Sequence, residues 1–214
     1  MRVQASSGLV FSAFLVVHLL AVMASPFGAS NYDRIQDATR PVYQAPAYEL
    51  LLLFLPLGVH IAAGILRMRR RPRTFATREL PWRTRLHRYG AWFLLFFIVG
   101  HAAATRVPSL VADATPGFAG VSYATSLLPA YFYPYYTLLG IAGLVHGGYG
   151  AYLSLRVLGM PRFDPRRVAW VMRGALVAGS LLVFLGVLSF GGAFYAIPDP
   201  SDHPYARFLR EFYP

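Results

Sequence analysis

Five long apolar segments constrain this chain more than any other feature. They lie at residues 6–25, 47–67, 88–107, 130–156 and 168–195 of a 214-residue sequence. A helix crosses the ~30 Å hydrocarbon layer in ~20 residues and satisfies its backbone polar groups within the segment. Little of the chain remains outside these segments. We therefore expect an all-α membrane protein, a single transmembrane domain (1–214) folded as a five-helix bundle.

Composition and charge narrow the class further. The chain is 56% hydrophobic and has no cysteine, which excludes disulfides, iron–sulfur ligation and c-type haem attachment. Its net charge of +11 does not indicate a nucleic-acid partner, because the arginines gather in two connections on one side of the bundle. One connection holds nine arginines, counted from Arg67 to Arg88 with both included. The other holds Arg156, Arg162, Arg166 and Arg167. Short arginine-rich loops stay cytoplasmic. This predicts a multi-pass inner-membrane protein with its N-terminus cytoplasmic and its C-terminus outside.

The parts outside the apolar segments give weaker signals. Residues 25–49 contain Pro, Gly, Asn and Asp and predict an irregular outer loop, and residues 107–129 form a second outer loop of similar length. The polar, aromatic tail (198–214) is expected to lie along the outer surface. Tyrosines at the start of the fourth segment are typical of an interfacial aromatic belt. The first segment also resembles a signal peptide, with Arg2 before it and cleavage after Ala24, and this alternative stays open.

One histidine lies near the middle of each of the first four segments: His18, His60, His101 and His146. Ionisable groups in hydrocarbon are costly, so they indicate function by default. Because chain direction alternates, His60 and His146 fall nearer the cytoplasmic face, and His18 and His101 nearer the outer face. Two pairs, ~15–20 Å apart by helical rise, predict two b-type haems with two histidine ligands each. Such haems transfer electrons and have no open position.

A weak internal repeat accompanies the histidines. A glycine precedes His18 and His101, at Gly8 and Gly90. His60 and His146 are instead followed by a glycine four residues later, at Gly64 and Gly150. Because i and i+4 share a helix face, we interpret the latter two as space for a porphyrin. His87 and His203 lie outside the apolar cores and are interpreted as solvated or interfacial. No carboxylate shares the depth of the histidines, which disfavours another transition-metal site.

One histidine on each of four helices, followed by a fifth helix without any, resembles the di-haem cytochrome b anchor of succinate dehydrogenase and fumarate reductase complexes. The stretches QASSGLVFSAFLVVHLL and RLHRYGAWFLLFFIVGH are similar to the family's first and third helices, and the resemblance covers nearly the whole chain. The respiratory cytochrome b that places two ligands on one helix fits less well, because no segment here has two.

The resemblance implies partners and a division of labour. The His60–His146 haem would lie nearer an iron–sulfur subunit, and the His18–His101 haem would be distal. Flavoprotein and iron–sulfur subunits would bind the cytoplasmic face, and a quinone (menaquinone) would be the substrate in the membrane. Dicarboxylate chemistry would belong to the flavoprotein, so this chain would supply only the quinone redox site.

Further site residues are hypotheses. Arg88, Arg156 and Arg173 are candidate partners for haem propionates, although long basic side chains also snorkel to the interface. Glu49 is a candidate for proton exchange with quinone near the outer haem, or an exposed acid at a helix N-terminus. No Asp or Glu lies within the hydrocarbon portions. We therefore expect electrogenic turnover, which membrane-potential measurements in proteoliposomes would test.

Two other functions remain open. One is a haem-free transporter or assembly protein whose histidines form helix–helix hydrogen bonds. The other is a di-haem anchor for a different dehydrogenase.

Overall fold

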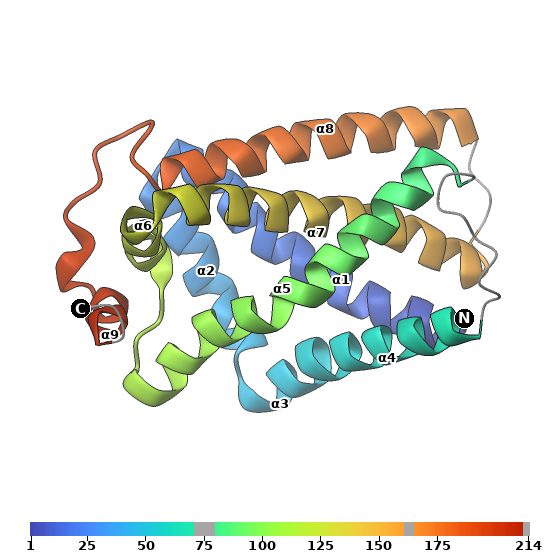
Figure 1. Cartoon of the computed structure of the whole chain (residues 1–214), viewed down its shortest axis with the longest axis horizontal. Helices are drawn as coiled ribbons and strands as arrows, with labels where there is room; N and C mark the ends of the chain where they lie inside the picture. Colours follow the sequence, from blue (N-terminus) through green and yellow to red (C-terminus); the bar gives the residue numbers. More distant parts are fainter. Residues whose placement is uncertain (71–79, 161–164, 212–214) are drawn as a thin grey trace. The chain divides into compact units, whose positions relative to one another are not determined.

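The computed structural model describes residues 1–70, 80–160 and 165–211, and within these ranges it is helical without strands. Five stretches are long and apolar enough to cross a membrane, which confirms the predicted all-α, multi-pass membrane class. They are Arg2–Phe27, Pro46–Arg69, Trp82–Ala112, Pro129–Val157 and Ala169–Ser189 (Figure 1). The arginine-rich connections include residues 71–79 and 161–164, which lie outside the described part of the chain.

Five long helices make up most of these stretches. They are α1 (Arg2–Ala24), α4 (Leu55–Arg69), α5 (Trp82–Ala112), α7 (Pro129–Val157) and α8 (Pro165–Ser189). The second span begins with α3 (Pro46–Glu49) and a π-helical turn, η2 (Leu50–Phe54), before α4. In a π turn the backbone hydrogen bonds span one more residue than in an α-helix. Pro56, which has no N–H to donate, lies two residues after the end of this turn.

The expectation of an irregular loop at residues 25–49 was wrong, and residues 107–129 are partly helical as well. Residues 25–49 contain η1 (Ser25–Phe27) and α2 (Ala29–Tyr43), and residues 107–129 contain α6 (Gly117–Leu127). In α2, Tyr32 and Gln36 are buried one turn apart, so packing of one helix face outweighs the turn-forming composition. Asp33 then accepts a hydrogen bond from the backbone N–H of Phe118 at 2.8 Å, which satisfies an N–H in the first turn of α6.

The fifth span is shorter than predicted. We expected it to continue to residue 195, but α8 ends at Ser189. The chain turns at Gly191 and Gly192, and Gly192 has a φ of 80°, a left-handed conformation that glycine adopts at little cost.

The chain forms two compact units; α1, α5, α7 and α8 contribute residues to both, and α4 belongs to unit 1. Unit 1 comprises Met1–Val17, Thr39–Leu95 and Ala142–Ala178. Unit 2 comprises His18–Ala38, Phe96–Ile141 and Gly179–Pro214. The core of unit 2 is a cluster of Ala21, Tyr32, Phe118 and Phe190, in which the Tyr32 and Phe190 rings meet edge to face at 5.4 Å.

Within unit 2, α1 and α8 approach each other at backbone distance. A Cβ on Gly186 of α8 would collide with the carbonyl oxygen of Val22 in α1. Beside this point the buried Ser189 hydroxyl donates to the Ser25 hydroxyl at 2.8 Å, and Ser25 donates to the Val22 carbonyl at 2.7 Å. The hydroxyl of Tyr195 donates to the Ser25 carbonyl at 2.6 Å. This polar group is satisfied internally, as burial requires.

The tail is anchored to unit 2 by its short helix. After η4 (Pro200–Asp202), α9 (Pro204–Arg210) lies beside α6 (Figure 1). Tyr205 and Ala206 are buried, and the Tyr205 hydroxyl donates to the Ala104 carbonyl of α5 at 3.1 Å. At the start of α9, the Nδ1 atom of His203 accepts a hydrogen bond from the Tyr205 N–H at 3.2 Å.

We expect α9 to loosen at acid pH because of this cap. Burial lowers the pKa of His203 from 6.5, against the opposing effect of Asp33. A protonated ring cannot accept the bond from Tyr205, so the released tail binds protons more readily than the packed tail. The stabilisation is therefore fully present above the ordinary pKa and is lost as pH falls from that value to the lowered pKa of the packed tail.

Hydrogen-exchange protection of α9 measures this effect. Protection in the wild type should be constant above the ordinary histidine pKa of about 6.5 and should fall progressively as the pH is lowered below it. In the His203→Asn variant, which keeps a side-chain acceptor but does not titrate, protection should be flat across that range. Equal pH dependence in both proteins would contradict the assignment.

Candidate functional site

In unit 1, the rings of His60 and His146 lie next to each other. His60 comes from α4 and His146 from α7, and both side chains are half-buried. Their ring centres are 6.0 Å apart, and the ring planes are inclined by 82°. Two helices distant in the sequence therefore present one imidazole each to the same place.

Hydrogen bonds to backbone carbonyls fix which nitrogen of each neutral ring carries the proton. The Nδ1 atom of His60 lies 3.0 Å from the Gln4 carbonyl of α1, and that of His146 lies 3.1 Å from the His87 carbonyl of α5. A carbonyl oxygen only accepts, so each Nδ1 carries the proton and each Nε2 keeps its lone pair. This is the arrangement that metal-ligating histidines adopt, with the second nitrogen donating to a carbonyl or a carboxylate.

In unit 2, His18 of α1 and His101 of α5 form the second pair. Their ring centres are also 6.0 Å apart, with planes inclined by 71°. The ring of Tyr135, on α7, lies 6.4 Å from that of His101 and 5.5 Å from that of Phe97. The outer tyrosines are thus more than an exposed belt, because Tyr135 is half-buried beside a candidate ligand while Tyr131 is 50% exposed.

The separation in both pairs suits an iron atom between two imidazoles. With metal–nitrogen bonds of about 2 Å and about 1.1 Å from nitrogen to ring centre, two axial ligands place their ring centres roughly 6 Å apart. Within the described residues, no group of three or more His, Cys, Asp or Glu side chains is positioned to hold a metal ion. A haem iron needs only two protein ligands, because the porphyrin supplies the other four. Each pair therefore fits haem better than a bare ion.

The weak internal repeat has a structural counterpart in unit 1. A Cβ on Gly8 of α1 would lie 2.8 Å from the Nδ1 atom of His60, and one on Gly90 of α5 would lie 3.4 Å from the Cβ of His146. These glycines let α1 and α5 approach the rings closely enough for the carbonyl hydrogen bonds. The residue that supplies the carbonyl precedes the candidate haem ligand of its own helix by 14 residues in both cases, Gln4 before His18 and His87 before His101.

The other two glycines face polar side chains of neighbouring helices. A Cβ on Gly64 would meet the side-chain amide nitrogen of Gln4 at 3.2 Å, and one on Gly150 would meet the Cε1 atom of His87 at 3.2 Å. Each glycine makes room for such a side chain, and its interpretation as space for a porphyrin stays a prediction.

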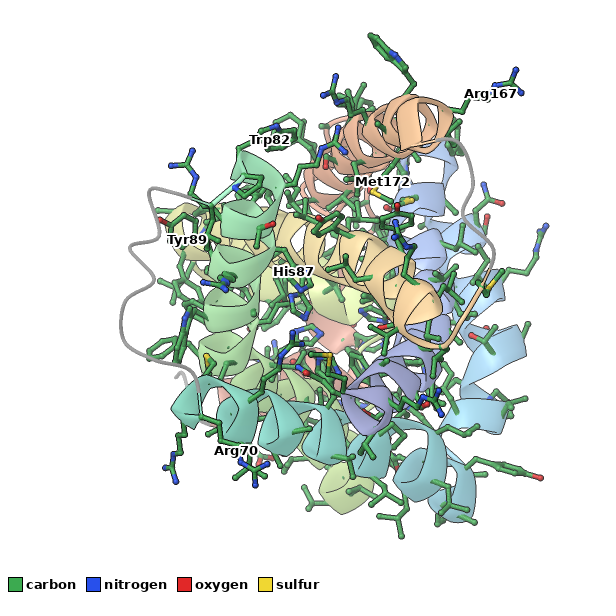
Figure 2. The ribbon with its side chains drawn as sticks, turned by 90° about the vertical axis from the view of Figure 1, so that its right-hand side faces the viewer. Arg70, Trp82, His87, Tyr89, Arg167 and Met172 are labelled. Atoms are coloured by element: carbon green, nitrogen blue, oxygen red, sulfur yellow. The ribbon has the colours of Figure 1, made fainter. Side chains whose placement is uncertain are left out.

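The interpretation of His87 as a solvated or interfacial residue was wrong. It lies within α5 and is half-buried, and its ring stacks on that of His146 with centres 4.2 Å apart and planes inclined by 7°. Its Nδ1 atom is buried and has no hydrogen-bond partner within the described residues. Figure 2 shows His87 among the helices, whereas Arg70 and Arg167 project outward.

The arginines predicted to hold propionates differ in their surroundings. Arg156 is exposed, and its guanidinium donates to the Tyr152 hydroxyl at 3.1 Å. Arg173 is exposed and lies over the Trp170 ring at 5.6 Å. Arg88 is half-buried and follows His87 directly, so it is the one of the three adjacent to a described site.

Glu49 lies at the end of α3, in unit 1, whereas the His18–His101 pair lies in unit 2. Its described neighbourhood includes Tyr43 and Arg40. Burial raises the pKa of Tyr43, Arg40 opposes this shift through its charge and a hydrogen bond, and the Glu49 carboxylate adds to it. Glu49 is therefore part of a polar group at the start of the second span.

Comparison with protein-family models, curated proteins and solved structures finds no match for this chain. Its function is therefore inferred from its own residues and their geometry.

Chemically, the two pairs can each offer neutral imidazole nitrogens to one metal centre. With each Nδ1 proton donated to a backbone carbonyl, the Nε2 lone pairs of His60 and His146 are available to bind a metal or to accept a proton. The arrangement suits a fixed ligand set in an apolar surrounding, which is what an electron-transfer centre requires.

Proposed function

We propose that this chain is a di-haem b membrane anchor of the succinate dehydrogenase and fumarate reductase type, which relays electrons between an iron–sulfur subunit and membrane quinone. The observation that carries the proposal is the His60–His146 pair, whose rings are 6.0 Å apart and whose Nδ1 atoms both donate to backbone carbonyls. The equal separation in the His18–His101 pair supports a second centre of the same kind.

The residues of the chain have distinct tasks in this proposal. Haem with two imidazole ligands supplies one-electron transfer without an open coordination position. His60 and His146 would provide Nε2 ligands whose orientation the Gln4 and His87 carbonyls fix. His18 and His101 would ligate the second haem, with Tyr135 packed beside His101. Arg88 is the propionate partner that these surroundings favour.

The orientation in the membrane is part of the proposal. Nine arginines between Arg67 and Arg88 support a cytoplasmic location for this connection and for the N-terminus. Flavoprotein and iron–sulfur subunits would bind this face, so that the His60–His146 haem receives or delivers electrons first. The His18–His101 haem would exchange electrons with menaquinone, and Glu49 would exchange protons with the quinone pool.

The leading rival is a haem-free protein whose histidines hydrogen-bond between helices. The bonds from His60 and His146 to carbonyls of α1 and α5 are compatible with that view. It gives no reason, however, for two pairs of rings at the same separation of 6.0 Å. A haem held by each pair would give one.

Two half-reactions test the proposal in the complex purified from its native membrane. We expect the complex to contain flavin and iron–sulfur subunits, and succinate to reduce b-type haem anaerobically. Oxidation of that haem by a menaquinone analogue should slow at least tenfold in Glu49→Gln, because proton exchange contributes about 10²–10⁴-fold, whereas reduction by succinate should not change.

Different failures of this experiment have different meanings. Co-purification with another dehydrogenase would replace the succinate partner but keep the electron relay. A complex without a b-type α band would contradict the relay itself. Unchanged oxidation by quinone in Glu49→Gln would remove only Glu49 from the proposal.

A further inference from the structure

The two residues of the internal repeat whose carbonyls accept these hydrogen bonds carry different side chains. Gln4 and His87 occupy corresponding positions, because each accepts from a candidate ligand of the neighbouring helix and each lies opposite an i+4 glycine. The carbonyl bond itself does not depend on the side chain. Since the repeat tolerates glutamine at this position, the imidazole of His87 needs a separate explanation.

His87 makes a contact that Gln4 cannot make. Its ring is nearly parallel to that of His146, with centres 4.2 Å apart. It is supported on α7 by Tyr149, whose ring meets it edge to face at 5.6 Å, and by the missing side chain of Gly150. A flat ring is thus held against the flat face of one candidate ligand.

A stacked ring restricts a motion that the hydrogen bond leaves free. The second side-chain torsion of histidine has a broad energy minimum, so the rotamer does not fix the ring plane. The hydrogen bond at Nδ1 and the proposed bond from Nε2 to iron fix two points of the ring. The ring can still rock about the line through these two nitrogens. A parallel ring at stacking distance opposes this rocking.

We propose that His87 is a positioning residue, which holds the imidazole plane of His146 nearly perpendicular to that of His60. This inference rests on the proposed function, because the consequence is expressed at the iron. The angle between axial ligand planes sets the splitting of the iron d orbitals. In the oxidised low-spin state, perpendicular planes give a larger low-field g value than parallel planes.

Electron paramagnetic resonance of the oxidised complex tests the inference. In His87→Gln, which copies the residue at the corresponding position of the repeat, both haems should remain. The low-field line of the His60–His146 haem should move to lower g and broaden. In His87→Phe, which keeps a flat ring but no nitrogen, that line should stay near its wild-type position. The line of the His18–His101 haem serves as internal reference.

The outcomes separate this inference from the function on which it rests. Unchanged lines in His87→Gln, or an equal change in His87→Phe, would overturn the positioning role while the haem assignment stands. Loss of one haem in His87→Gln but not in His87→Phe would support the role of the ring. Loss of one haem in both His87→Gln and His87→Phe would overturn the role of the ring, because the imidazole nitrogen and not the flat ring would then be required. A wild-type complex without haem would overturn the proposed function as well.

Discussion

Replacing His60 or His146 with alanine should remove one haem and leave the other, and replacing His18 or His101 should remove only the second. Each pair lies within its own unit, with ring centres 6.0 Å apart, so each variant disrupts a single ligand set. A haem whose iron loses one of its two histidine ligands would be attached to the protein by a single coordination bond. We therefore expect haem per chain to fall by about half in each single variant, and to vanish when one member of each pair is replaced.

Haem content and the reduced-minus-oxidised spectrum of each purified variant measure this. His203→Ala is the matched control, because it removes a histidine that lies outside both pairs and should retain full haem content. Spectra of His60→Ala and His146→Ala should match each other and differ from those of His18→Ala and His101→Ala. Loss of the same haem in all four variants would break the pairing.

Gly186→Ala should prevent stable folding of the chain. The added Cβ would collide with the Val22 carbonyl, which is backbone and cannot rotate away as a side chain does. Separating α1 from α8 here would also disturb the buried hydrogen bonds between Ser25 and Ser189. We expect a loss of about 3 kcal/mol or more in the free energy of unfolding, at or above the upper end of ordinary overpacking.

Gly174→Ala in the same helix provides the control. A Cβ there meets no described atom within 4 Å, so only the gain in helix propensity, about 1 kcal/mol, remains. Denaturant titration in detergent and the folded fraction in size-exclusion chromatography compare the two variants. If both alanines had the same effect, the close approach of α1 and α8 would be wrong.

The sequence predicted the helices that cross the membrane but not those beside it. Hydropathy detects the apolar core of a span, whereas the helix continues into the interface wherever its residues favour helix. For this reason α5 begins at Trp82 and not at residue 88, and His87, placed outside the span, lies within it. The helices α2 and α6 were missed because burial of residues such as Tyr32 and Phe118 depends on tertiary packing.

Parts of the candidate site were accessible from the sequence, and parts were not. Alternating chain direction grouped the four histidines into the pairs whose rings lie together. The carbonyls of Gln4 and His87 carry no side-chain signature, and only their shared spacing of 14 residues before His18 and His101 points to them. Tyr135 was one of several tyrosines with the same interfacial pattern, and only the structure singles it out beside His101.

The most direct test is the haem content of the wild-type chain, purified with its partners and extracted for quantification of b-type haem against protein. The two histidine pairs predict two haems per chain, with a reduced-minus-oxidised α band typical of cytochrome b. A chain without haem, or with one haem that survives replacement of any one histidine, would contradict the account.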